Sequence, residues 1–578
     1  MRNRVGRQSL PHPWIAVGLL VVAFAACAPL RAAENVIDRL VLQKAKQDGV
    51  ALVGLSTDSE FLRRVTLDVT GRLPTPEKAR EFLASTDPDK RTKLVDSLFP
   101  PLPVMGMRSV AEHPFLDRWA YFFNDLFRNG ELLGEGINTF YTHIYKSLTL
   151  NISYDEFVRD LITASSVSTW SDGAANFVAR NHIFEGDGYQ INHEDTADEI
   201  AIATTKLFLG VNLECVSCHD GRAHLEKVNL WLSTRKRSDL WRQANFFGKT
   251  FIGPVYGRFP HFRVADTAHG YDLTTTSSLR PPRYKADITP TFLLTGERAG
   301  AGESPRQAYA RLLTSNPQFA RATVNLFWAE LMGRGIVENP FDFDLARQDP
   351  ANPPPAPWPL QPSNPELLNA LAEDFRASGY DLRHIIKTIV TSHTYQLSAK
   401  PPAKWSEAHA GHFNRRLTHR LSAQQLWDAV ADVTNNYPEI KVTYSDKKVK
   451  YVMQMRSPMD ADKSDRALFK TMNAFGQCDR YQSEAEIRPS MVQAALLLND
   501  QTLRNRVRAV KGSRAEALAN AAPEARAALI EEIYLAALSR PPSAEEAKVA
   551  SEYLASRGKE GAEDLLWAML NGIEFLFY

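Results

Sequence analysis

Cysteine is scarce in this sequence: its 578 residues contain four, at positions 27, 215, 218 and 478. This excludes a small disulfide-stapled scaffold, because such scaffolds need several cysteine pairs in a short chain. An excess of charge of one sign is lacking too, since 68 Lys and Arg stand against 67 Asp and Glu, giving a net charge of +1. A basic face for nucleic acid would raise the net charge, so no nucleic-acid partner is predicted.

Long apolar runs are lacking as well, apart from one short run near the N-terminus. A segment with three arginines precedes "WIAVGLLVVAFAACA" at residues 14–28, and small residues follow. This order is typical of a secretory signal, and the run is too short for a membrane span. We therefore expect a signal peptide over residues 1–33, a mature chain without a transmembrane span, and a periplasmic or secreted location. Cys27 follows two alanines, which leaves a lipid anchor on this cysteine as an alternative.

The rest of the sequence is typical of helices. Hydrophobic residues make up 44% of the chain, as in an ordinary globular protein. They recur at three- and four-residue spacing on both sides of a segment rich in Thr, Pro and Gly. We therefore predict a mainly α protein with two helical domains, residues 34–265 and 301–578. The linker between them, residues 266–300, could form a short strand pair.

Capping residues predict individual helix ends. Thr75 before a proline is a typical helix start. Thr196 with Glu199 predicts a capping box that opens a helix, and Gly210 predicts its end. The segment "ECVSCH" comes next, so it should lie on a turn or short helix after a buried amphipathic helix.

Two segments near opposite ends of the chain are weakly similar in sequence. "LRRVTLDVTGRLPTPEKAREFLAS" near the start is similar to "IEEIYLAALSRPPSAEEAKVASEYLAS" near the end. Two similar helical hairpins explain this likeness, and two copies do not indicate a solenoid.

The most informative motif is the CxxCH formed by Cys215, Cys218 and His219. In c-type haem attachment two thiols at this spacing bond to the vinyl groups of the porphyrin, and the next histidine coordinates the iron. This attachment takes place outside the cytoplasmic membrane, in agreement with the predicted signal peptide. We therefore predict one covalently attached haem c, held by Cys215 and Cys218, with His219 as the metal ligand.

Three other kinds of site could use the same residues. A structural zinc site would draw on Cys215, Cys218, His219 and His224, although no distant second pair of ligands exists. A redox dithiol normally begins a helix after a strand, whereas this pair follows a predicted helix. A disulfide between the two cysteines would close a very small loop with little entropic gain.

The sixth iron ligand would decide between electron transfer and activation of a small molecule. The candidates are His143, His182, His193, His261, His269, Met332, Met453, Met455 and Met459. Taken singly, each is more often an ordinary surface or core residue than a ligand.

Two further sets of charged residues could have either a functional or a structural role. The acidic run Glu194, Asp195, Asp198 and Glu199 could bind calcium or act in acid–base chemistry. Carboxylates at a helix start are expected from the helix dipole, and we favour that interpretation. Arg416 and Arg420 could bind propionates or acidic sugar groups from one helical face, but a solvated or acid-paired face is the commoner outcome.

Several segments together have a familiar order. In the N-terminal half they include "LRRVTLDVTGRLPTPEKAREFL", "SYDEFVRDLI" and "DEIAIATTKLFLGVNLECVSCHDGRAHL". In the C-terminal half they include "FARATVNLFWAELMGRGIVENPFDFD", "NRRLTHRLSAQQLWDAV" and "MVQAALLLND". The chain thus resembles large secreted proteins that join a planctomycete-type cytochrome c-like domain to a C-terminal partner domain of unknown function. This resemblance implies an exported, mainly helical protein with one haem-type motif. Many members continue the motif as CHDHP, whereas this chain has Gly221 at the second histidine position.

These features are compatible with three functions. The leading hypothesis is an exported c-type haem protein in periplasmic electron transfer, or the electron-accepting part of a substrate oxidation, with a redox partner protein or a carbohydrate-type substrate. The second is a non-haem envelope binding or scaffold protein with a structural metal or disulfide at the CxxCH. The third is a polysaccharide-related hydrolase, for which the sequence contains no nucleophile elbow, HExxH or phosphate loop. No enzymatic activity is assigned from the sequence.

Overall fold

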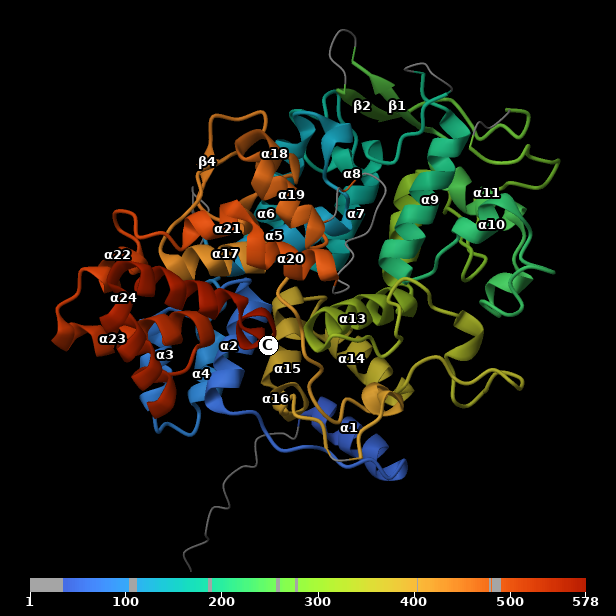
Figure 1. Cartoon of the computed structure of the whole chain (residues 1–578). Helices are drawn as coiled ribbons and strands as arrows, with labels where there is room; N and C mark the ends of the chain where they lie inside the picture. The colour runs from blue at the N-terminus through green and yellow to red at the C-terminus, as the bar shows by residue number, and fades with distance from the viewer. Residues whose placement is uncertain are drawn as a thin grey trace, which may run out of the picture.

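The computed structural model is mainly α-helical (Figure 1). It describes residues 35–102, 112–185, 190–255, 260–275, 279–402, 404–477, 480 and 490–578. These residues form 25 α-helices and two small antiparallel sheets, which confirms the predicted fold class. None of the helices in these ranges combines the length and apolar character needed to cross a membrane. The predicted signal peptide and Cys27 lie outside the described residues.

The helices fall into three sets along the chain. The first set is α1 (Val36–Gln47), α2 (Asp58–Thr70), α3 (Pro76–Ala84), α4 (Lys90–Ser97), α5 (Pro114–Leu126), α6 (Gly136–Thr149), α7 (Tyr154–Thr163) and α8 (Ala175–Ala179). The second is α9 (His193–Leu209), α10 (Glu214–Cys218), α11 (Arg237–Ala244), α12 (Pro305–Ser315), α13 (Pro317–Met332), α14 (Pro365–Ala377), α15 (Leu382–Thr391) and α16 (His393–Gln396). The third is α17 (Ala423–Thr434), α18 (Met459–Ser464), α19 (Arg466–Ala474), α20 (Met491–Asn499), α21 (Gln501–Arg506), α22 (Arg514–Ala519), α23 (Pro523–Leu538), α24 (Ala544–Asn571) and α25 (Ile573–Leu576).

The strands form two hairpins. In the first, β1 (Thr250–Pro254) pairs antiparallel with β2 (Phe262–Asp266), and in the second, β3 (Ile440–Lys441) pairs with β4 (Lys448–Val449). The strand pair expected in residues 266–300 is therefore misplaced, because the hairpin ends where that segment begins and residues 279–300 contain no strand. This segment is packed and does not act as a loose linker: Phe292 is fully buried in the core. The Asn245 side chain also donates a hydrogen bond to the Ile288 carbonyl at 2.7 Å.

Local sequence signals predicted two helix ends correctly and one incorrectly. Thr75 caps α3 by accepting a hydrogen bond from the Lys78 amide, as predicted. Gly210 ends α9 in the left-handed conformation, with φ 67°, also as predicted. The predicted start of α9 is wrong, because Asn192 caps the helix four residues earlier than Thr196 would. The Thr196 hydroxyl instead accepts a hydrogen bond from the Ile183 amide.

The two similar sequence segments form two similar helical hairpins, α2 with α3 and α23 with α24. Gly71 and Ser539 occupy equivalent positions, and both end their helices in the left-handed conformation, with φ 71° and 56°. Thr75 and Ser543, four residues further along, both cap the following helix. The two hairpins also contact each other, since α3 packs against α23. The similar sequences therefore form two helical hairpins that are locally alike and pack against each other.

Each of two hydrophobic cores contains residues from both halves of the sequence. The first joins side chains such as Phe123 in α5 with Phe319 in α13. The second is built mainly from residues after 420, but Leu67 and Tyr121 belong to it. The halves are also joined by buried charge, because the Arg63 guanidinium donates hydrogen bonds to two carbonyls of the C-terminal hairpin region. The halves of the sequence therefore do not have separate cores.

A buried polar cluster lies at this junction. The Asp68 carboxylate accepts hydrogen bonds from the hydroxyls of Tyr395 at 2.6 Å and Tyr578 at 2.9 Å. Arg416 forms an ion pair with the same carboxylate at 3.1 Å, and its side chain is fully buried. Arg416 is thus acid-paired, the outcome we expected to be commoner. It precedes α17 and does not lie on a helix.

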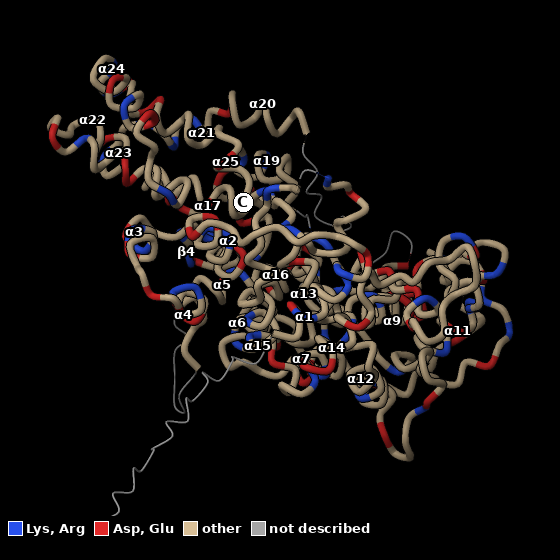
Figure 2. Tube along the Cα trace, turned by 90° about the horizontal axis from the view of Figure 1, so that it is seen from below, with Lys and Arg blue, Asp and Glu red and all other residues tan. Residues whose placement is uncertain are grey.

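The helices around the CxxCH motif lie at one end of the molecule. In both views α9 and α11 are on the right, and α22, α23 and α24 are on the left (Figures 1 and 2). The C-terminal hairpin is therefore far from the CxxCH motif.

Candidate functional site

The CxxCH motif occupies α10 and the residue after it, as predicted. Gly210 turns the chain after α9, and α10 follows as a helix of five residues. Cys215 is exposed and Cys218 is partly exposed, and both are free thiols. His219 follows in an extended conformation, with φ −137° and ψ 150°, and is exposed. The structure thus brings the three predicted site residues together on an accessible turn.

His224 is the neighbour of His219. The two imidazole rings have a centroid separation of 5.2 Å and are tilted by 33°. Both side chains are exposed, and neither ring is hydrogen-bonded to another residue that the structure describes. Ala223, in the left-handed conformation with φ 68°, turns the chain and brings His224 back toward the motif.

Arg237, at the start of α11, holds the backbone of the motif. Its Nε donates a hydrogen bond to the Ser217 carbonyl at 3.2 Å, and its backbone amide donates to Asp220 Oδ1 at 2.9 Å. Its two terminal nitrogens donate to the carbonyls of Pro281 and Pro282 at 2.6 and 3.1 Å. Because Arg237 is only 8% exposed, these bonds are shielded from water. The turn is therefore fixed from its buried side while Cys215 stays accessible.

Gly221 allows a second contact that shapes the turn. Its amide donates a hydrogen bond to the Arg235 carbonyl at 2.8 Å. A Cβ atom at position 221 would lie 1.9 Å from the Leu232 carbonyl oxygen, so no side chain fits there without moving the backbone. The histidine of the CHDHP pattern would therefore not fit this turn. His224 is the histidine found beside His219 instead.

A small pocket of about 160 Å³ opens beside Cys215. Its apolar wall includes Leu225, Val228 and Phe341, so both halves of the sequence contribute to it. Ligand pockets are usually about 300–1,000 Å³. The thiols and the imidazole fit covalent haem attachment, but this pocket does not enclose a porphyrin. A group bonded to Cys215 would remain partly exposed to solvent.

The electrostatics of the thiols disfavour the redox dithiol. Burial raises the pKa of the Cys215 thiol, and the nearby carboxylates of Glu214 and Asp342 raise it further. Reactive cysteines have a lowered pKa, since the thiolate is the nucleophile. The motif also follows a helix, whereas a thioredoxin-like motif follows a strand.

The zinc alternative has little geometric support. In the ranges that the structure describes, no group of three or more His, Cys, Asp or Glu side chains is arranged to hold a metal ion. A structural zinc site normally has four such ligands. Cys478, the remaining cysteine, lies outside the described residues, and the two described cysteines form no disulfide.

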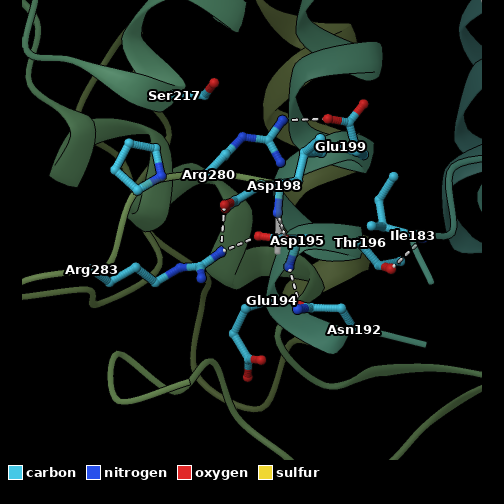
Figure 3. A network of polar contacts seen from close by, with 12 residues as sticks. Ile183, Asn192, Glu194, Asp195, Thr196, Asp198, Glu199, Ser217, Arg280 and Arg283 are labelled. Carbon is cyan, nitrogen blue, oxygen red and sulfur yellow. Dashed lines mark hydrogen bonds and ion pairs between the residues drawn. The ribbon is translucent and has the colours of Figure 1, made fainter. Parts of the chain in front are cut away.

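Behind the motif, α9 carries a buried network of acids and arginines (Figure 3). Arg283 forms ion pairs with Asp195 at 2.9 Å and with Asp198 at 2.8 Å, and the two carboxylates are fully buried. Arg280 forms a further ion pair with Glu199. The acidic run is therefore more than a solvated helix start, and the arginines of residues 280–283 complete it. Because Arg237 binds the prolines between these two arginines, one segment links the network to the CxxCH turn.

The carboxylate of Asp198 has an unusual environment. Burial raises its pKa to about 6, although Arg283 and Arg280 act in the opposite direction. The Tyr271 hydroxyl donates a hydrogen bond to this carboxylate at 2.7 Å, and burial raises the pKa of Tyr271 so that it stays protonated. Asp198 therefore changes charge within the range in which proteins are commonly studied. The sequence signal for its partners was "LRPPRY", where two arginines flank a proline pair next to the acid-rich helix in the fold.

Most candidates for a sixth ligand are core or structural residues. Met332, Met453 and Met455 are at most 2% exposed and belong to the hydrophobic cores. His182 is buried, and burial lowers its pKa to about 4. The side-chain partners of three other histidines are Asp160 for His143, the Gly248 carbonyl for His193 and the Ser168 hydroxyl for His261. For the other two candidates, His269 and Met459, no side-chain hydrogen bond to another described residue is seen; His269 is exposed and Met459 is partly buried.

Comparison with known families identifies two domains. Residues 36–231 match the family model PSCyt2, described as a protein of unknown function (DUF1549). Residues 305–554 match PSD1, described as a protein of unknown function (DUF1553). This pair is consistent with the two-domain organisation that the sequence resembles. No curated protein and no solved structure matches the chain.

Proposed function

We propose that the CxxCH turn is the attachment site for one haem c, and that the protein acts in electron transfer outside the cytoplasm or as the electron-accepting part of a substrate oxidation. One observation carries the proposal. Two free thiols and an imidazole at CxxCH spacing lie together on an accessible turn whose backbone is fixed from behind. Haem, when bound, supplies one-electron oxidation and reduction at its iron.

Each residue of the CxxCH turn would have its own role in haem attachment. Cys215 and Cys218 would form the two thioether bonds, and His219 would be the iron ligand. Arg237 would hold the turn, since it bonds the Ser217 carbonyl between the two cysteines. Glu214 and Asp342 place negative charge near Cys215, and negative charge favours the oxidised form of a redox group.

The proposal is tested by expressing the exported chain together with a haem-loading system. The expected result is a pyridine-haemochrome spectrum of thioether-linked haem that survives denaturation and acid extraction. The double variant Cys215→Ala, Cys218→Ala should lose this spectrum, whereas the control Cys478→Ala should keep it. Colourless protein with both thiols free overturns the proposal.

A second variant separates attachment from iron ligation. His219→Ala should keep both thioether bonds, and so the denatured haemochrome, while the visible spectrum of the native protein changes. Elemental analysis distinguishes the scaffold alternative, because one iron per chain supports haem and one zinc per chain contradicts it.

A further inference from the structure

A large groove lies at the end of the molecule opposite the CxxCH turn. It has a volume of about 960 Å³ and is lined by α24 and by residues around the α23–α24 connection. Figures 1 and 2 both show these helices projecting from the left of the molecule. The groove is six times larger than the pocket at Cys215, and its volume is in the range of ligand sites.

The groove exists because α24 is bent into two arms. At Gly558 the backbone leaves the helical region, with φ 55° and ψ −121°, and the residues on either side are helical. The arms stay close near this bend, where the Tyr553 hydroxyl on one arm donates a hydrogen bond to Asp564 on the other at 2.8 Å. The groove is lined by both arms, and Tyr534 of α23 contributes to it.

The apolar walls of the groove combine aliphatic side chains with the aromatic rings of Tyr534, Tyr553 and Trp567. Val549 and Ala550 line it from the first arm, and Leu565, Ala568 and Met569 line it from the second. Val549 is 59% exposed, which is unusual for a large aliphatic side chain beside other apolar groups. Positions 545, 546, 549, 550 and 553 repeat at helical spacing, so they form one continuous face.

The charged groups of the groove are mainly acidic. Its lining has three carboxylates, those of Glu545, Glu546 and Asp564, and one guanidinium, that of Arg540. The Arg540 guanidinium is already bonded to the carboxylates of Glu546 and Glu574. Glu545 is exposed and forms no ion pair with another described residue. The lining of the groove therefore carries a net negative charge.

We propose that this groove binds an amphipathic helix of a partner protein, with the apolar face of the helix between the two arms and basic side chains against Glu545 and Asp564. A helix laid between two helices packs by ridges and grooves, and it buries the apolar walls. The acidic lining attracts basic residues and repels anionic ligands such as fatty acids.

The test uses two fluorescent helical peptides of about 20 residues, long enough to hold helical structure in water. Both carry leucines on one face, and one has lysines and the other glutamates along the flanks. Fluorescence anisotropy with the full chain should show at least tenfold tighter binding of the lysine peptide. Glu545→Lys should reduce this preference.

Two matched variants locate the site. Val549→Asp places a charge in the groove and should weaken binding of the lysine peptide at least tenfold. Val167→Asp is the control, because Val167 is 86% exposed and lies outside the groove, and it should leave binding unchanged. Both variants should unfold in urea at concentrations close to that of the parent.

Three outcomes would overturn the proposal. One is that neither peptide binds, and another is equal binding of both peptides whether or not Val549 is replaced. The third is a concentration-dependent dimer of the chain that Val549→Asp abolishes, since a second copy would then occupy the groove.

Discussion

The Nε atom of Arg237 lies 3.2 Å from the carbonyl oxygen of Ser217, between the two cysteines of the CxxCH motif. This hydrogen bond joins α11 to α10, and the same guanidinium reaches two proline carbonyls in the segment that carries Arg280 and Arg283. Arg237 thus connects the exposed CxxCH turn to the segment whose arginines form the buried ionic network of α9. A fixed backbone behind one exposed and one partly exposed thiol is what covalent attachment of a flat cofactor at fixed spacing requires.

Replacing Arg237 should loosen the turn. In Arg237→Met the buried carbonyl of Ser217 and the partly buried carbonyls of Pro281 and Pro282 lose their donor. We therefore expect a loss of about 1–3 kcal/mol in the free energy of unfolding. Urea unfolding measures this loss, and hydrogen exchange of the amides of residues 216–221 should become faster. Arg235→Met is the matched control, because the Arg235 side chain bonds only its neighbour Thr234 and stacks on Trp231. Equal effects of the two replacements would contradict the role given to Arg237.

Gly221 should not accept a side chain. Gly221→Ala places a Cβ atom against the Leu232 carbonyl oxygen, and we expect a destabilisation of about 1–3 kcal/mol from overpacking. Gly221→His, which restores the CHDHP pattern, should be at least as harmful. Gly270→Ala is the control, since its added Cβ meets nothing within 4 Å. Thermal unfolding compares the three, and a stable Gly221→His variant would show that the turn adapts.

The sequence predicted features that depend on neighbouring residues. Gly210 ends a helix through its own backbone conformation, and the CxxCH spacing places three side chains on one turn, so both predictions were confirmed. It did not predict that Arg283 would pair with Asp198, because these residues are 85 positions apart and their approach depends on the whole fold. The wrong start of α9 has the same cause, since Thr196 bonds Ile183 in a segment outside the helix.

Asp198 should make stability depend on pH. Its pKa is about 6 in the folded protein against an ordinary value of 3.8, so the folded state binds more protons between these values. Stability from this group is therefore present below about pH 4 and is lost as the pH rises through 6. The difference between these two pKa values corresponds to about 3 kcal/mol in the free energy of unfolding.

This pH dependence is measured as a difference between parent and variant. The free energy of unfolding of the parent minus that of Asp198→Asn should fall by up to about 3 kcal/mol between pH 4 and pH 7. Subtraction removes the contribution of other buried acids, such as Asp117 and Asp428, whose pKa values burial also raises. A difference that is constant over this range would mean that Asp198 keeps an ordinary pKa.

Replacing each of two arginines tests how much their contacts between the N-terminal and C-terminal regions contribute to stability. Arg63 is buried and donates hydrogen bonds at 2.6 and 2.7 Å to the carbonyls of Ala537 and Phe575. Arg80, also in the N-terminal hairpin, forms an ion pair with Glu531 but is 52% exposed. We expect Arg63→Met to cost about 2–4 kcal/mol and Arg80→Met less than about 1 kcal/mol. Urea unfolding of both variants checks the order, and a larger cost for Arg80→Met would contradict the burial argument.

Because both cores contain residues from both halves, neither half should fold alone. A fragment of residues 34–300 lacks Phe319, which packs in the first core, and a fragment of residues 301–578 lacks Leu67, which packs in the second. Each fragment should therefore expose apolar surface, bind the dye ANS and unfold without a cooperative transition. Mixing or co-expressing the two fragments should restore a single cooperative transition, because the complementary core surfaces are then both present. A fragment that unfolds cooperatively alone, with a Tm close to that of the whole chain, would show that the shared cores contribute little to its stability.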